Sequence, residues 1–297
     1  EPTFCPGCQY RPVFYALKNV TEHISEESNL EFIYGGDIGC YTLAEAYPYQ
    51  MIDWIVCMGA GIGISNGMAQ AIDPNRQKIV AFVGDSTFFH TGIEPFLNAI
   101  KHEIDIPILI FNNYWTAMTG HQAHLATPRS LLHRAGSYSD TDGKELSLIK
   151  FLESLGLEDL TITDAYNIDK LERLFTRKFT QKGTKVIVVN EECALEKKRR
   201  LRKKSASKPT GSRKQEVYYT ITDSCVKCNE CIEFLGCPAI NARVNKVGQG
   251  EEEADISYYI DETACIPNVC PGLCKSVCKN NAIVKTIINR QRRGEEK

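Results

Sequence analysis

Short apolar runs alternate with longer amphipathic stretches over the first 190 residues of the chain. Runs of four to six apolar residues are typical of buried strands and too short for helices. They predict strands at residues 30–34, 79–83, 106–111, 160–163 and 185–189. The stretches between and around them predict helices at 12–24, 64–72, 92–101, 146–155 and 168–181. This alternation indicates an α/β fold with a doubly wound parallel sheet.

Polar residues stand where two neighbouring predicted strands end. Gly84-Asp85-Ser86 follows the strand at 79–83, and Asn112-Asn113 follows the strand at 106–111. Both positions fall at the carboxyl edge of a parallel sheet, where ligands bind. One carboxylate, one amide oxygen and one loop carbonyl would hold Mg²⁺ against a diphosphate. The plain alternative is an ordinary strand–helix–strand unit in which Asp85 caps a helix.

The spacing of these residues resembles the thiamine diphosphate motif, which is usually written GDG…NN. Ser86 stands in place of the second glycine. The resemblance implies that Mg²⁺ is held by the side chains of Asp85 and Asn113 and by the main-chain carbonyl of Trp115. The loop at 114–128 would then lie over the diphosphate and offer it hydroxyl, amide and imidazole groups: Thr116, Thr119, Gly120, His121, Gln122 and His124. A lone histidine is more often structural than catalytic.

The chain contains 13 cysteines, and their grouped spacing favours metal ligation in a reducing compartment over disulfides. Cys5 and Cys8 form a C-x-x-C pair, while Cys40 and Cys193 each follow a predicted strand. Together these four could hold a [4Fe–4S] cluster beside the cofactor. The alternative is that they are small buried residues, which is also the interpretation of Cys57.

A basic run divides the chain. Residues 197–214 contain ten lysines and arginines and no acidic residue, so the remainder carries a net charge of −12. This predicts a first domain at 1–196, a basic linker at 197–214 and a second domain at 215–297. The run is a solvated linker or a surface for an acidic partner such as a ferredoxin. Nucleic acid is a weaker option, because no aromatic residues are interleaved.

The second domain carries eight cysteines in two motifs. Cys225-x2-Cys228-x2-Cys231-x5-Cys237-Pro is followed by Cys265-x4-Cys270-x3-Cys274-x3-Cys278. This double pattern resembles a small α+β bacterial two-cluster ferredoxin, in which each motif lends its fourth thiolate to the other cluster. The resemblance implies two [4Fe–4S] sites, which are Cys225, Cys228, Cys231 with Cys278, and Cys265, Cys270, Cys274 with Cys237. Two zinc sites are the alternative, but both motifs repeat the ferredoxin ending.

Six segments together resemble one family. They are CPGCQYRPVFYAL, GGDIGCYTLA, CMGAGIGISNG, GDSTFFHTGIEPFLNAI, NNYWTAMTGHQ and VIVVNEECAL. They are similar to the C-terminal half of the α subunit of indolepyruvate ferredoxin oxidoreductase, within the wider 2-oxoacid:ferredoxin oxidoreductase family. The resemblance implies oxidative decarboxylation of a 2-oxoacid, through a thiamine diphosphate enamine, to acyl-coenzyme A and CO₂. Electrons would leave through [4Fe–4S] clusters to ferredoxin.

The same resemblance implies the site and the partners. Asp37, Cys40, Met58, Met118 and Thr119 would line the thiazolium, beside the diphosphate site at Gly84, Asp85, Ser86, Asn113 and Trp115. The wider family also places a cluster on cysteines that match Cys5, Cys8, Cys40 and Cys193. The domain that binds the pyrimidine and supplies an activating glutamate has no counterpart here, so a partner subunit must bring it, and another the γ-type domain.

Three questions stay open. The substrate is indolepyruvate or another arylpyruvate, or else pyruvate, a branched-chain 2-oxoacid or 2-oxoglutarate. The chain is a catalytic subunit of a hetero-oligomer, or an electron-transfer module or zinc protein without catalysis. No apolar run approaches a membrane span and nothing resembles a signal peptide, so a cytoplasmic location is expected.

Overall fold

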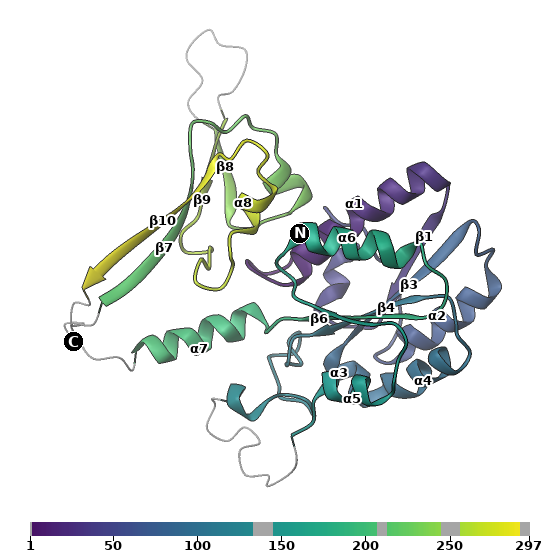
Figure 1. The fold of residues 1–297 in the computed structure, drawn as a ribbon. Helices are drawn as coiled ribbons and strands as arrows, with labels where there is room; N and C mark the ends of the chain where they lie inside the picture. Colours follow the sequence, from purple (N-terminus) through teal and green to yellow (C-terminus); the bar gives the residue numbers. More distant parts are fainter. Residues whose placement is uncertain (1, 133–144, 207–212, 245–255, 292–297) are drawn as a thin grey trace. The chain divides into compact units, whose positions relative to one another are not determined.

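A computed structural model of the chain describes residues 2–132, 145–206, 213–244 and 256–291 (Figure 1). The chain forms two compact units. The first contains residues 12–193, and the second contains residues 3–11 together with residues from 194 onward. None of the helices in the described ranges is both long and apolar enough to cross a membrane.

The first unit is built on a six-stranded sheet with the order β2-β1-β3-β4-β6-β5. All neighbouring strands run parallel. The order changes direction between β1 and β3, and such a switch point is where open α/β sheets bind ligands, at the carboxyl ends of the strands. The strands are β1 (Glu31–Gly36), β2 (Trp54–Ile55), β3 (Gln77–Gly84), β4 (Pro107–Asn112), β5 (Leu160–Thr163) and β6 (Lys185–Asn190).

Helices cover both faces of this sheet, as Figure 1 shows. On one face lie α1 (Tyr10–Ser28) and α6 (Ile168–Phe179); on the other lie α2 (Ala60–Ala71), α4 (Ile93–Lys101) and α5 (Leu148–Ser154). The short helix α3 (Asp85–Thr87) and a π-helical turn, η2 (Phe88–Gly92), connect β3 to α4. The predicted α/β fold with a parallel sheet is therefore confirmed.

The central strands are apolar on both faces, as expected for a parallel sheet covered on both sides. In β3, Ile79 and Val83 belong to the core that α2, α4 and α5 cover. The intervening Phe82 packs on the opposite face, where its ring lies edge-on to Phe14 of α1 at a centroid distance of 5.2 Å. Because strand side chains alternate between faces, one strand joins two cores.

Buried charges at the amino edge of the sheet are all partnered. Lys185 Nζ donates to Asp105 Oδ1 at 2.9 Å and to the carbonyl oxygens of Gln181 and Gly183. Lys78 Nζ donates to the carbonyl oxygens of Phe179 and Gln181, each at 3.0 Å. Burial lowers the pKa of both lysines, and the carboxylate of Asp105 opposes that shift.

The second unit consists of small elements. Strands β7 (Arg213–Ile221) and β10 (Ile283–Gln291) form one antiparallel pair, and β8 (Ile240–Val244) and β9 (Ile256–Ile260) form another. Helix α7 (Ala194–Ala206), the π-helical turn η4 (Glu230–Phe234) and helix α8 (Leu273–Val277) complete it. Its assignment to the two-cluster ferredoxin fold stays a prediction.

Arginine 11 ties the N-terminal segment into the second unit. Its side chain is 1% exposed. Nε donates to the carbonyl oxygen of Cys5 at 3.0 Å, and Nη1 donates to the carbonyl oxygens of Leu235, at 3.3 Å, and of Gly236. The bonds to Leu235 and Gly236 cross more than 220 residues of sequence, which explains why residues 3–11 group with the C-terminal part of the chain.

The units differ from the predicted domains in two ways. Residues 3–11 were expected in the first domain, and the division falls after residue 193 rather than 196. Residues 194–206 form helix α7, so the first part of the predicted linker at 197–214 is helical. Residues 207–212 of that linker lie outside the described ranges.

Candidate functional site

Asp85 lies at the carboxyl edge of the sheet and is 1% exposed. It follows β3, and its carboxylate faces the chain that follows β4. Oδ1 accepts from the Ser86 amide at 2.9 Å, and Oδ2 accepts from the Tyr114 amide at 2.6 Å. The two strand ends that the sequence marked are therefore joined by the carboxylate itself.

His124 also contacts this carboxylate, which sequence reasoning did not identify. Its Nε2 lies 3.2 Å from Asp85 Oδ2, and its side chain is 1% exposed. The Ala126 amide donates to Nδ1 at 3.3 Å. Since Nδ1 accepts a hydrogen bond, the neutral imidazole carries its hydrogen on Nε2, which donates a hydrogen bond to Asp85. The contact joins a loop residue to a strand end, so it produces no periodic pattern in the sequence.

Asn113 begins a tight turn beside Asp85. Its Oδ1 accepts from the Trp115 amide at 2.8 Å, and its carbonyl oxygen accepts from the Cys193 amide at 3.1 Å. An amide oxygen has two lone pairs and is a ligand type that a hard cation accepts. A buried carboxylate and a buried amide oxygen on adjoining segments are the donor set that Mg²⁺ prefers. The residues present therefore fit a magnesium ion with a diphosphate.

The loop that follows is closed on itself beside Ser86. Thr116 Oγ1 lies 2.8 Å from Ser86 Oγ, and the Thr116 amide donates to the Gln122 carbonyl oxygen at 2.9 Å. Thr119 Oγ1 donates to Gln122 Oε1 at 2.7 Å. These bonds hold the predicted phosphate-facing hydroxyls in a fixed loop, with Met118 exposed at its tip.

Asp37, which follows β1, is 1% exposed and only partly satisfied. Its Oδ1 accepts a short bond from the Gly61 amide at 2.5 Å. Among the described residues, its Oδ2 has no hydrogen-bond partner. Burial raises the pKa of Asp37 to about 6, although amide bonds from Gly61 and Gly59 oppose the shift.

Two glycines allow this approach to the start of α2. A β-carbon on Gly61 would lie 2.7 Å from Asp37 Oδ1, which no real side chain tolerates. Gly59 precedes the helix with φ of 92°, a conformation that favours glycine. These two glycines thus let the backbone at the start of α2 approach a carboxylate of the same chain closely.

Apolar side chains are exposed along this edge. They lie on the loops after β1, β2 and β4, and each is more than 40% exposed: Ile38, Val56, Met58, Met118 and Leu125. Cys57 lies among them and is exposed. The prediction that Cys57 is a core residue was wrong, because β2 contains only two residues and the chain leaves the sheet directly after it.

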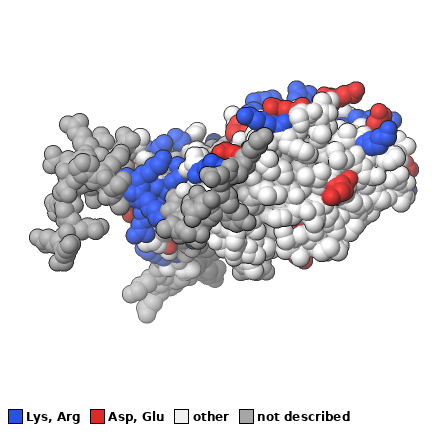
Figure 2. Space-filling model, turned by 90° about the horizontal axis from the view of Figure 1, so that it is seen from below, with Lys and Arg blue, Asp and Glu red and all other residues white. Residues whose placement is uncertain are grey.

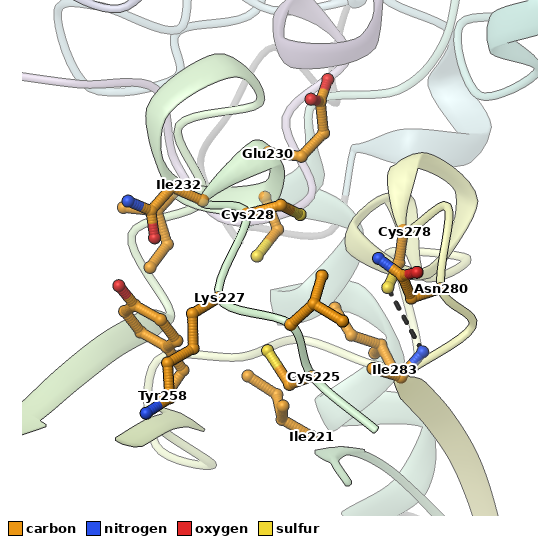
Figure 3. Close-up of a pocket in the computed structure, with 14 residues that line it drawn as sticks. Ile221, Cys225, Lys227, Cys228, Glu230, Ile232, Tyr258, Cys278, Asn280 and Ile283 are labelled. Atoms are coloured by element: carbon orange, nitrogen blue, oxygen red, sulfur yellow. Dashed lines mark hydrogen bonds between the residues drawn. The ribbon is translucent and has the colours of Figure 1, made fainter. Parts of the chain in front are cut away.

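Four of the second unit's cysteines surround one pocket. It is lined by Cys225, Cys228, Cys231 and Cys278, and Figure 3 shows the sulfur atoms of the three labelled ones facing the same space. The Ala282 amide donates to Cys278 Sγ at 3.3 Å. Burial raises the pKa of Cys231 to about 12, and the other three thiolates add to the shift.

The other four cysteines form a second group. Burial raises the pKa of Cys274, and the charges of Cys237, Cys270 and Cys265 raise it further. Thiols whose pKa values are raised by each other's negative charge would be stabilised as thiolates by a cation or a metal cluster. Tyr219, which sequence reasoning did not identify, lies beside this group, and burial raises its pKa to about 12.

Within the described ranges, no group of three or more His, Cys, Asp or Glu side chains could hold a metal ion. In a [4Fe–4S] cluster each thiolate binds a separate iron, so the two cysteine groups stay candidates for clusters. The third predicted set spans both units, with Cys5 and Cys8 in the second and Cys40 and Cys193 in the first. That set stays a prediction.

Comparison with known proteins identifies the region around Asp85. Residues 37–189 match the family described as "Thiamine pyrophosphate enzyme, C-terminal TPP binding domain". Over 95% of its length the chain is 31% identical to indolepyruvate oxidoreductase subunit IorA of Archaeoglobus fulgidus, and 30% identical to that of Methanothermobacter thermautotrophicus. The chain spans only 39% and 40% of these relatives.

A solved structure shares the fold at low sequence identity. The 2-oxoglutarate:ferredoxin oxidoreductase of Magnetococcus marinus superposes with a TM-score of 0.55 at 14% identity. The match covers 65% of each chain. This likeness extends the fold assignment and, at that identity, says nothing further about the site.

Proposed function

The chain belongs to the thiamine pyrophosphate enzymes through their C-terminal TPP-binding domain, and from that premise we propose that it is a subunit of a 2-oxoacid:ferredoxin oxidoreductase. The similarity to IorA over 95% of the chain supports indolepyruvate or another arylpyruvate as the substrate. The proposed reaction is oxidative decarboxylation to an acyl-coenzyme A and CO₂.

One observation carries the proposal. The Asp85 carboxylate bonds to the amide at Tyr114, directly after Asn113, and this junction lies inside the region that matches the family. A carboxylate and an amide oxygen lie there at the carboxyl ends of β3 and β4, next to the switch point between β1 and β3. We propose that Asp85, Asn113 and the Trp115 carbonyl hold Mg²⁺, and that Gly84 and Ser86 lie against the diphosphate.

The remaining residues of this edge would hold the reacting end of the cofactor. When bound, thiamine diphosphate supplies a carbanion that attacks the 2-oxoacid carbonyl and an electron sink for the decarboxylation. Asp37, Cys40, Met58, Met118 and Thr119 would surround the thiazolium. Met58 and Met118 are 43% and 49% exposed, so they can exclude water only when another surface covers them.

The exposed apolar side chains of the carboxyl edge support the proposal that partner polypeptides bind there. Single exposed apolar side chains are ordinary, but a set along one edge indicates an interaction surface. We propose that a subunit with the pyrimidine-binding domain covers this edge and brings the activating glutamate, and that a further subunit brings the γ-type domain. The relatives are named as subunits of an oxidoreductase, which supports a hetero-oligomer.

The two cysteine groups would carry electrons. We propose a [4Fe–4S] cluster on Cys225, Cys228, Cys231 and Cys278, and a second on Cys265, Cys270, Cys274 and Cys237. A third, on Cys5, Cys8, Cys40 and Cys193, would lie beside the cofactor. Electrons would pass through the clusters to a ferredoxin.

Cofactor content tests this proposal. The complex is purified anaerobically with its co-purifying subunits, and iron, sulfide, zinc and thiamine diphosphate are measured per chain. About eight irons with one thiamine diphosphate support two clusters, and about twelve support three. Zinc in place of iron, or clusters without thiamine diphosphate in the complete complex, contradict the enzyme. Viologen reduction with indolepyruvate, pyruvate, 2-oxoisovalerate and 2-oxoglutarate then ranks the substrates.

A further inference from the structure

Helix α7 carries an unusually dense positive charge. Seven of its 13 residues are lysine or arginine. Lys198, Arg199, Arg202, Lys203 and Lys204 are exposed. Lys198 and Arg202 are four residues apart and therefore lie on one side of the helix. Figure 2 shows lysine and arginine side chains gathered in one region of the surface. This region has the same horizontal position as α7 in Figure 1, because the two views differ by a turn about the horizontal axis.

The helix is packed against the second cysteine group. Ala194 at its start shares a buried cluster with Ile266 and Val269, against which Leu201 and Cys270 are packed. Ala194 and Leu201 are seven residues apart, so one stripe of the helix faces this loop. The loop between Cys265 and Cys270 thus lies under a basic helix of the same unit.

The charge of α7 reaches the thiols. Lys198 of this helix lies near enough to Cys265 for the two side chains to interact electrostatically. The surroundings of the first cysteine group are different. Its pocket is lined by one basic residue, Lys227, and one acidic residue, Glu230 (Figure 3). Within the described ranges, the dense positive surface therefore accompanies the second group.

We propose that the exposed basic side of α7 is the docking surface for an acidic electron-carrier protein, which exchanges electrons with the cluster at Cys237, Cys265, Cys270 and Cys274. This inference rests on the proposed function. It adds the cluster from which electrons leave and the surface on which the carrier binds. One electron leaves the reduced cluster and enters the oxidised carrier, and no bond or proton is exchanged.

Charge complementarity selects this occupant. A helix with seven positive side chains attracts an acidic surface and speeds its encounter, and salt weakens both effects. Electron-transfer partners form small, weak and transient interfaces, which suits one face of a four-turn helix. Nucleic acid is the competing polyanion, and the test below separates the two.

The test compares charge reversal on α7 with a matched control. K198E/R202E reverses two charges on the proposed surface. R202E alone reverses one charge and keeps Lys198, which lies near Cys265. The control is K285E, because Lys285 is also exposed and lies on β10 of the same unit. Each variant is studied in the assembled holoenzyme, with an acidic two-cluster bacterial ferredoxin as the carrier and methyl viologen as a small acceptor.

Calorimetric titration of oxidised ferredoxin at low salt gives the main result. We expect K198E/R202E to weaken binding roughly tenfold or more, R202E to weaken it less, and K285E to leave it unchanged. The salt dependence of binding should flatten in the double variant. In turnover, the KM for ferredoxin should rise by a similar factor while the rate with methyl viologen is kept.

Several outcomes would overturn the docking surface. Equal ferredoxin affinity in the double variant and the wild type would do so, and so would an equal loss in K285E. Loss of affinity for single-stranded RNA without loss for ferredoxin would assign the helix to nucleic acid. If the wild type binds ferredoxin through α7 but no 2-oxoacid reduces viologen, the proposed enzyme fails while the docking surface stands.

Discussion

The two edges of the parallel sheet differ in how completely their buried charged side chains are partnered. At the amino edge, Lys78 and Lys185 converge on Asp105 and on carbonyl oxygens, and every contact is made within the unit. At the carboxyl edge, Asp37 Oδ2 has no partner among the described residues. Burying an unpartnered carboxylate oxygen costs free energy. The comparison teaches that charge at the first edge serves folding, and it supports the proposal that charge at the second edge serves a ligand.

The largest expected effect breaks the amino edge. Lys185→Ala leaves the Asp105 carboxylate and two carbonyl oxygens with fewer partners, so we expect the free energy of unfolding to fall by about 3–5 kcal/mol. The matched control is Lys170→Ala, which removes an ion pair to Asp164 that is half exposed and should cost less than about 1 kcal/mol. Urea unfolding of both variants checks this. Equal losses would show that the buried network carries no special weight.

The next effect breaks the carboxyl edge without breaking the fold. In Asp85→Asn, the amide oxygen can still accept one of the two amide bonds, but the charge that would hold Mg²⁺ is lost. We expect thiamine diphosphate to bind the assembled complex about 100-fold more weakly, or about 2.7 kcal/mol. Titration with Mg²⁺ and thiamine diphosphate measures this, with Asp73→Asn in an exposed turn as control. Unchanged affinity would remove Asp85 from the metal site.

A third prediction sharpens the contrast through pH. The pKa of Asp37 is raised by burial to about 6, so the folded state holds this proton more tightly than the unfolded state. Its stability therefore falls as pH rises from about 4 to 6. Asp37→Asn should remove that slope and raise the free energy of unfolding at pH 8, measured by urea unfolding, by about 3 kcal/mol. Parallel pH profiles for the two proteins would contradict this.

The smallest effect concerns how the carboxylate is held. His124→Ala removes the Nε2–H donor to Asp85, and outer partners of metal ligands typically contribute 10-fold or more to metal affinity. We expect the Mg²⁺ requirement for thiamine diphosphate binding to rise about 10-fold. His124→Gln, which retains a donor, should restore most of the affinity. If neither variant changes it, the imidazole is only a packing residue.

The sheet could be predicted because its strands are short apolar runs between polar turns. The strand at 160–163 was predicted with the bounds it has. Strands β1, β3, β4 and β6 were predicted to within two residues, and the two-residue strand β2 was not predicted. The positions of Asp85 and Asn113 at one edge followed from parallel pairing alone. Such predictions succeed where the signal is local and periodic.

The missed features depend on contacts that the sequence does not show locally. The sequence of helix α7 resembles a solvated linker because lysine and arginine dominate it. Its apolar stripe is short, and Leu201 is the one large apolar residue of that stripe packed on the cluster. The contact between His124 and Asp85 joins a loop to a strand end across 39 residues. Cys57 was misplaced because an apolar neighbourhood in sequence, Ile55-Val56, continues into an exposed loop.

The discontinuous second unit has a consequence for how the chain is made. Its first segment, residues 3–11, leaves the ribosome before all of the first unit, but its partners begin at residue 194. At ordinary synthesis rates Arg11 waits roughly 10–40 s for the carbonyl oxygens that it binds. During that time Cys5 and Cys8 are newly made thiols without their native surroundings. A chain cut at residue 193 would keep them so permanently, and the second unit cannot be expressed as one uninterrupted fragment.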